Sequence, residues 1–129
     1  MTSVVRFAIV VGAVLGGLSV AAGAFGAHGL KAMLEASGQS GNWETAARYG
    51  VYHALALVAV GVLAATRPDA TGLVTVVWCF LGGALIFSGC LAALALTGVK
   101  MLGAIVPIGG MLLIAGWARL AFIAARLAG

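Results

Sequence analysis

Two histidines are the side chains of this sequence best suited to chemistry within an apolar environment. His28 follows a long uncharged stretch, and His53 lies inside a second one. Tyr49 precedes His53 by four residues, which places the phenol and the imidazole on one face of a helix. Glu44 lies slightly upstream. An ionisable group in an apolar span is a functional hypothesis by default, so we take these four residues as a candidate ligand-binding site for a small molecule, an ion or a quinone.

A structural role for the two histidines is the alternative, and we favour it. Each imidazole can hydrogen-bond a carbonyl or a neighbouring tyrosine and order a helix end. Two imidazoles without a nearby thiolate or carboxylate cluster make a poor metal site, so we expect neither a metal nor another cofactor. The sequence also has no G-x-S-x-G, H-E-x-x-H or phosphate-binding glycine motif and no paired carboxylates, and it therefore predicts no catalytic residues and no enzyme.

The composition is that of a membrane protein. Apolar residues make up 64% of the 129 residues and charged residues 8%, whereas a soluble domain carries about 25% charged residues. The positive net charge of +4 forms no basic stripe, so we expect no nucleic-acid partner. The expected surroundings are the lipid bilayer, and the basic residues indicate topology and contact with anionic headgroups.

Four apolar segments are long enough to cross a bilayer, which takes about 20 residues each. Their approximate ranges predict a single all-α domain over 1–129, an integral membrane four-helix bundle: 4–26, 43–66, 73–97 and 102–126. A signal peptide is the alternative for the first segment, but its uncharged core is longer than a signal peptide needs. In the fourth segment we place the start near Leu102, with a kink at Pro107, because a start at Pro107 would leave Arg119 deep in hydrocarbon.

Between the first two spans, a short amphipathic helix is predicted over about 29–37, lying in the interface. We expect this helix to cover His28 and His53 and the two imidazoles to approach within about 10 Å, close enough to share one water. Asn42 is the predicted N-cap of the second span. An aromatic belt at headgroup depth is predicted for Trp43, Tyr49 and Tyr52.

Small residues recur along the first span at steps of four, three, four and three. They predict a helix face that lets a neighbouring helix approach closely, and they make the first span the expected centre of the bundle. These helix-packing residues are Gly12, Gly16, Ser19, Gly23 and Gly26.

Charged residues decide the expected orientation and exclude one function. Four arginines (Arg6, Arg67, Arg119, Arg126) fall on the side of both termini and three basic residues (Lys31, Arg48, Lys100) on the other side. This bias favours a multi-pass protein of the cell (inner) membrane with both termini in the cytoplasm.

The acidic residues argue against a proton-coupled exporter. Exporters of this size need a carboxylate inside the membrane, whereas the three acidic residues here fall in loops or helix starts.

Four sequence stretches together resemble the family of small four-span membrane proteins called domain of unknown function 423. They are GAFGAHGLK (23–31), WETAARYGVYHALAL (43–57), IFSGCLAALALTG (86–98) and PIGGMLLIAGWA (107–118). Cys90 departs from the family pattern, which has a small polar residue at this position. The resemblance implies an integral membrane protein with no established reaction. We expect a structural or accessory component that packs against itself or a larger membrane complex, with the small-molecule, ion or quinone site beneath the first loop as the alternative.

Overall fold

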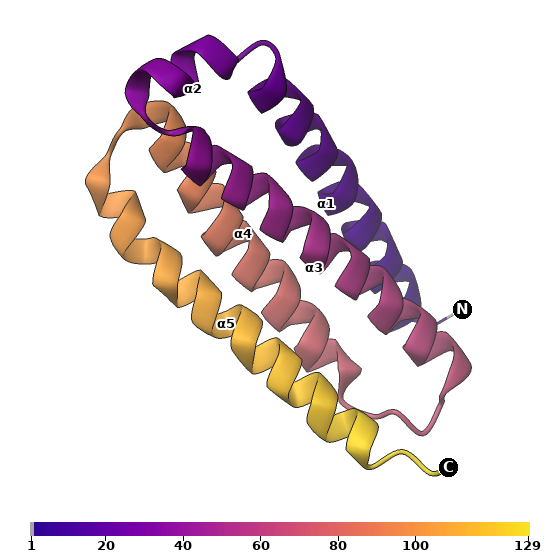
Figure 1. Ribbon diagram of the computed structural model, residues 1–129. Coiled ribbons are helices and arrows are strands. Elements are labelled where there is room, and N and C mark those ends of the chain that lie inside the picture. The colour runs from indigo at the N-terminus through magenta and orange to yellow at the C-terminus, as the bar shows by residue number, and fades with distance from the viewer. Residues whose placement is uncertain (1) are drawn as a thin grey trace.

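The computed structural model describes residues 2–129, which form five helices and no strand (Figure 1). Four of the helices are long and apolar enough to cross a membrane, as the sequence predicts. The elements are α1 (Ser3–Ala27), α2 (Lys31–Ser37), α3 (Ser40–Thr66), α4 (Leu73–Thr97) and α5 (Lys100–Ala125).

The observed helix ends lie within three residues of the predicted ones, and the start of α3 differs most. The interfacial helix ends at Gly38, which adopts a left-handed conformation (φ 71°) that favours glycine. The next helix already begins at Ser40, so Asn42 is not its N-cap; instead the Asn42 amide donates to the Gln39 side chain at 2.8 Å. Hydropathy predicts where the apolar span begins, and the first three residues of α3 (40–42) precede that point. The last helix starts at Lys100 and contains Pro107 in its interior.

The helices are arranged with α3 and α4 in the middle. Helix α1 packs along α3, and α5 packs along α4, so α1 and α5 lie at opposite edges of the bundle (Figure 1). Nine residues of α3 are buried, against five of α1. The expectation that the first span is the most enclosed is therefore wrong, because its small-residue face engages chiefly one neighbour.

The small-residue face of α1 does pack against α3. A Cβ added at Gly12 would lie 2.9 Å from the Ala54 carbonyl oxygen, and one added at Gly16 would lie 3.4 Å from the Ala54 Cβ. Buried Ser19 packs on Gly50 in the same seam. Towards the end of the helix the contact loosens, because Gly23 is exposed and its nearest neighbour is the Ala47 Cβ at 4.0 Å.

The Trp43 side chain is buried where α1, α2 and α3 meet. Its indole covers Gly26, where an added Cβ would overlap the ring, and its N–H donates to the Ala22 carbonyl at 2.7 Å. The side chain is 9% exposed and packs with Leu34 of the interfacial helix. Glycine at 26 therefore provides the space for this indole, and Trp43 joins α1, α2 and α3.

A second close seam joins α4 to α5. At Gly109 an added Cβ would lie 2.4 Å from the Phe87 backbone nitrogen, and at Gly83 it would lie 2.7 Å from the Leu113 side chain. At Gly116 the added atom would meet the Phe80 ring at 2.8 Å. The contacts at Gly109 and Gly116, with backbone and ring atoms, leave no room for a side chain, so these glycines set the spacing of the two helices.

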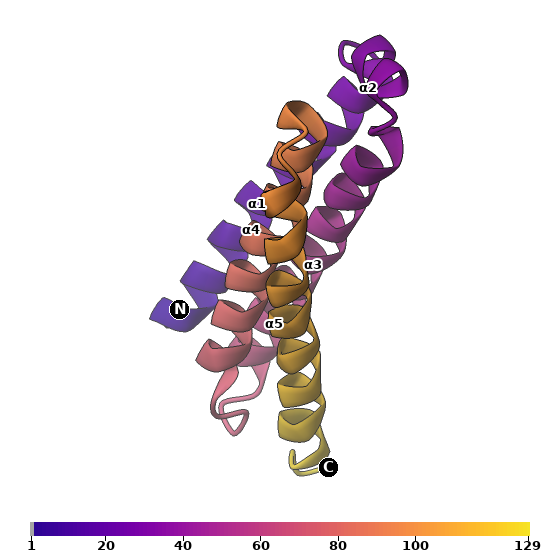
Figure 2. The same cartoon turned by 90° about the vertical axis from the view of Figure 1, so that its left-hand side faces the viewer.

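Both termini lie at the end of the bundle opposite α2 (Figure 2). Thr2 lines a hollow together with Pro68 of the α3–α4 loop, and the Arg67 guanidinium donates to the Ala128 carbonyl at 2.7 Å. This end therefore contains the N-terminus, the α3–α4 loop and the C-terminus. Helix order places Arg67 and Lys100 at opposite ends, as four spans require.

Candidate functional site

His53 lies deep in the bundle. It is thirteen residues from Ser40, which places it about 20 Å along α3, near the middle of the helix. The residue is only 5% exposed, and with Ser19 it makes up the buried polar residues found among residues 2–129. A polar group at this depth needs internal hydrogen-bond partners because hydrocarbon supplies none.

Both ring nitrogens of His53 have such partners. The Trp117 indole N–H of α5 donates to Nε2 at 3.1 Å, and Nδ1 lies 2.8 Å from the Tyr49 backbone carbonyl. An indole nitrogen only donates, so Nε2 is the acceptor and Nδ1 carries the proton that it donates to Tyr49. The two contacts together define a neutral imidazole of fixed tautomer.

Aromatic rings enclose this pair on the α4 side. Phe80 meets His53 edge-on at 5.5 Å between ring centroids and lies 4.8 Å from the Trp117 ring. Tyr49 stacks on Phe87 at 4.8 Å and lies 6.3 Å from the imidazole. We call these five residues the aromatic cluster; it fills the junction of α3, α4 and α5 with rings in favourable tilted and stacked geometries.

His28 does not reach the aromatic cluster. It is exposed at the end of α1. The residue of α1 at the level of His53 is Gly16, which faces Ala54, and His28 is twelve residues further on, about 18 Å along the helix. The prediction that the two imidazoles approach within about 10 Å beneath α2 is therefore wrong. The reason is the length of helix that precedes His53. Even from the predicted start at Trp43, His53 is ten residues, about 15 Å, along the helix, and the earlier start at Ser40 adds about 4.5 Å.

Glu44 belongs to a different place. Its carboxylate pairs with Arg48 one turn later and is largely exposed. It also lines a pocket of about 340 Å³ beneath α2. The pocket walls are Gly23, Gly26, Ala27, Lys31, Leu34, Glu35, Ser40, Trp43, Glu44 and Ala47. The structure thus brings Tyr49 and His53 together, and leaves Glu44 in the pocket under α2 and His28 outside both.

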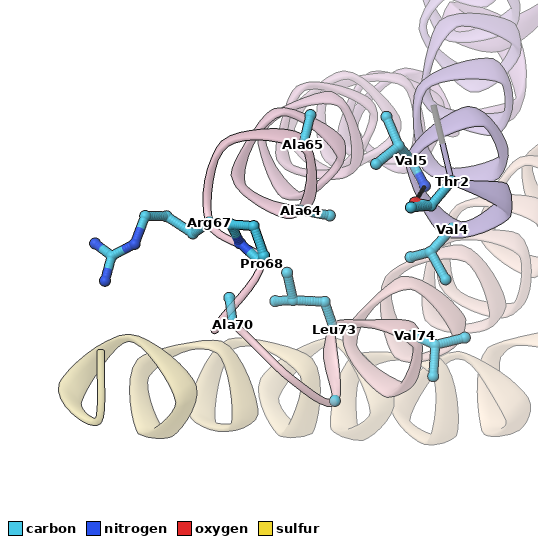
Figure 3. Close-up of a pocket in the computed structure, with 11 residues that line it drawn as sticks. Thr2, Val4, Val5, Ala64, Ala65, Arg67, Pro68, Ala70, Leu73 and Val74 are labelled. Carbon is cyan, nitrogen blue, oxygen red and sulfur yellow. Dashed lines mark hydrogen bonds between the residues drawn. The ribbon is translucent and has the colours of Figure 1, made fainter. Parts of the chain in front are cut away.

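A hollow of about 640 Å³ lies between the start of α1, the end of α3 and the start of α4 (Figure 3). Its walls are mainly valine, alanine and leucine side chains. The Thr2 hydroxyl accepts from the Val5 backbone N–H at 3.3 Å, and the Arg67 side chain points away from the hollow (Figure 3). This hollow consequently offers an apolar surface and no free reactive group. Within residues 2–129, no three His, Cys, Asp or Glu side chains lie close enough to hold a metal ion.

The family described as "Protein of unknown function (DUF423)" matches residues 22–110, more than two thirds of the chain. The chain belongs to the DUF423 family. Relatives named "UPF0382 membrane protein" support the assignment. The protein of Staphylococcus haemolyticus is 45% identical over 112 residues, covering 87% of this chain and 89% of the relative. That of Staphylococcus aureus (strain bovine RF122 / ET3-1) is 40% identical over 121 residues, covering 94% and 97%. No solved structure matches this chain.

The DUF423 match includes four residues of the aromatic cluster and ends before Trp117. Trp117 and Phe80 are the residues that sequence reasoning missed as partners of His53. One signal for Trp117 is present in the sequence: an indole N–H in the middle of an apolar segment needs an acceptor, and a neutral His53 is the deepest acceptor available. The chain is thus an integral membrane protein of DUF423 whose deepest polar group is internally paired.

Proposed function

We propose that this protein is a structural or accessory component of the membrane and not an enzyme. The observation that carries the proposal is the pairing of His53. Its two nitrogens are engaged by Trp117 and Tyr49, and aromatic rings surround it. To bind a ligand, this imidazole would have to give up one of its two internal hydrogen bonds, and the one from Trp117 ties α3 to α5.

The placement of the carboxylates supports the same proposal. Glu35 lies in α2, Glu44 near the start of α3 and Asp69 in the α3–α4 loop. Both Glu44 and Asp69 are paired with an arginine. Coupled exchange of protons and cations across the membrane would require a carboxylate in the middle of a span.

We place the protein in the cell (inner) membrane with both termini in the cytoplasm. The end that carries the termini has four arginines and one acidic residue (Arg6, Arg67, Arg119, Arg126 and Asp69). The opposite end has three basic and two acidic residues. The positive-inside rule favours the arginine-rich end as the cytoplasmic one.

Native mass spectrometry of the full chain in mild detergent tests the accessory role. We expect the measured masses to correspond to the polypeptide and bound lipids. The polypeptide would be present as one copy, as several copies or together with a stoichiometric protein partner. A tightly retained organic molecule or metal ion that is lost in His53→Leu, with the fold intact by circular dichroism, would contradict the proposal.

A small-molecule site beneath α2 is the second candidate function. The pocket of about 340 Å³ there combines an indole wall with charged groups of both signs, Lys31, Glu35 and Glu44. Apolar walls with a few polar groups are typical of small-molecule sites. The pocket lies beneath the first loop, and its lining residues do not include His28, Tyr49 or His53.

Filling this pocket tests the second candidate. Gly23→Leu would place a side chain in it, because an added Cβ at Gly23 meets only the Ala47 Cβ at 4.0 Å. Gly17→Leu is the matched control, since Gly17 is exposed and has no neighbour within 4 Å. A retained molecule that disappears in Gly23→Leu alone supports the site, and equal retention in both variants eliminates it.

A further inference from the structure

Two arginines at the end of α5 are positioned around one aromatic ring. Arg119 and Arg126 are seven residues apart, with Phe122 between them on the same side of the helix. The guanidinium carbon of Arg126 lies 4.4 Å from the Phe122 ring centroid, and that of Arg119 lies 5.5 Å from it. Cation–π contacts of this kind hold both positive groups near each other without neutralising them.

Neither guanidinium has a carboxylate partner among residues 2–129. The ion pairs there join Arg48 to Glu44 and Arg67 to Asp69. Asp69 is the acidic residue nearest to the two arginines, and Arg67 already occupies both of its oxygens, at 2.9 and 2.7 Å. This hydrogen bonding holds the pKa of the Asp69 carboxyl below its usual range, so the carboxylate stays charged and paired with Arg67.

A pocket of about 140 Å³ lies between the two arginines and the α3–α4 loop. Its lining residues are Asp69, Thr71, Arg119, Phe122, Ile123, Arg126 and Leu127. The volume corresponds to about four or five water molecules at ~30 Å³ each, which suits a phosphate group. The Thr71 hydroxyl adds a donor, and the occupied Asp69–Arg67 pair contributes no net charge.

We propose that Arg119 and Arg126 form a binding site for a phosphate ester, supplied by the headgroup of an anionic phospholipid. Guanidinium groups bind phosphate oxygens through two parallel hydrogen bonds. The site lies at the arginine-rich end, about 28 Å along α5 from Lys100, where the helix reaches the bilayer surface. Basic pockets beside membrane helices are suited to anionic headgroups. The proposal holds whether or not the protein is an accessory component.

Lipid titration followed by native mass spectrometry tests the site, using the full chain in mild detergent with phosphatidylglycerol or phosphatidylcholine. Arg119→Gln/Arg126→Gln should weaken phosphatidylglycerol binding at least about tenfold, because two charged hydrogen-bond donors are lost. Arg6→Gln/Lys100→Gln removes the same net charge outside the pocket and should change binding less than about twofold. Equal weakening in both double variants, or equal binding of the two lipids to the wild type, would overturn the proposal.

Two further arms keep the test decisive. Arg119→Lys/Arg126→Lys keeps the charge and the helix but loses the planar fork, and we expect intermediate binding; unchanged thermal melting identifies variants that remain folded. In the second arm, glycerol 3-phosphate competes with phosphatidylglycerol. Poor competition supports the lipid headgroup as the source, whereas displacement at equal concentration assigns the site to a soluble phosphate ester and overturns the lipid assignment.

Discussion

At the scale of single residues, the neutral tautomer of His53 is the most informative feature. The imidazole accepts a hydrogen bond from Trp117 of α5 and donates one to the Tyr49 carbonyl of its own helix α3, so its protonation state follows from its partners. The sequence pairs Tyr49 with His53 on one helix face, and their rings lie 6.3 Å apart. It predicts His53 near the interface, whereas the residue lies near the middle of α3. Its partner Trp117 is 64 residues away, and this contact depends on how α3 and α5 are rotated about their axes, which no local pattern encodes.

Asp69 offers a residue-scale prediction outside the membrane. Because the Arg67 hydrogen bond favours the charged form, the folded-state pKa of the Asp69 carboxyl lies below its usual value of 3.8. The pairing stabilises the folded state above that pH, and this stabilisation is lost as the pH falls through the lowered pKa. In Arg67→Gln the pKa of Asp69 should move up towards 3.8, as measured by ¹³C NMR of the carboxyl group. An unchanged titration in this variant would show that Arg67 does not set the pKa.

At the scale of elements, the two glycine seams set the packing. The periodic glycines of α1 could be identified in the sequence because they recur at helical spacing. Gly109 and Gly116 stand seven apart on α5 and face Phe87 and Phe80 of α4; they could not be distinguished from the neighbouring glycines without knowing which side of α5 meets α4. Sequence patterns thus identify a packing face more readily than its partner.

The α4–α5 seam predicts opposite outcomes for two adjacent glycines. Gly109→Ala should destabilise the protein by about 1–3 kcal/mol or more, because the new Cβ would lie 2.4 Å from the Phe87 backbone nitrogen. Gly110→Ala is the matched control, since its Cβ would meet the Phe87 ring at an ordinary 3.6 Å. Thermal unfolding in detergent measures both, and equal melting temperatures would contradict this packing.

The α1–α3 seam gives a parallel prediction. Gly12→Ala brings a Cβ within 2.9 Å of the Ala54 carbonyl oxygen and should destabilise by about 1–3 kcal/mol. Gly17→Ala adds the same methyl group on the exposed side of α1, where no atom lies within 4 Å. Both variants change helix propensity in the same way, so the difference between their thermal stabilities measures the effect of the contact between α1 and α3. If Gly17→Ala is the more damaging, α1 contacts α3 through another face.

At the scale of the whole molecule, the sequence predicts the number of spans and the interfacial helix but not which helix is central. Long uncharged segments report directly on membrane crossing. Centrality depends on how many neighbours each helix contacts. The α1 seam engages one partner, whereas α3 meets both α1 and α4. A row of small residues therefore predicts close approach and does not predict enclosure.

The four-span topology predicts opposite labelling at the two ends. Single cysteines at Thr71 and Val99, both exposed, would be introduced into a chain in which Cys79 and Cys90 are replaced by alanine. A membrane-impermeant thiol reagent applied to intact cells should label Val99→Cys and leave Thr71→Cys unlabelled until the membrane is opened. The reverse pattern would invert the orientation, and labelling of both from outside would refute four spans.

A double-mutant cycle on His53 and Trp117 tests the structural role of the buried imidazole most directly. Thermal or denaturant unfolding of His53→Leu, Trp117→Phe and the double variant should give a favourable coupling of about 0.6–1.7 kcal/mol, the size found for hydrogen bonds between membrane helices. Native mass spectrometry of the same four proteins should show no bound molecule whose retention depends on either residue. Additive effects with no coupling, or a fully stable double variant that loses a bound molecule, would contradict the structural role and make His53 a ligand site.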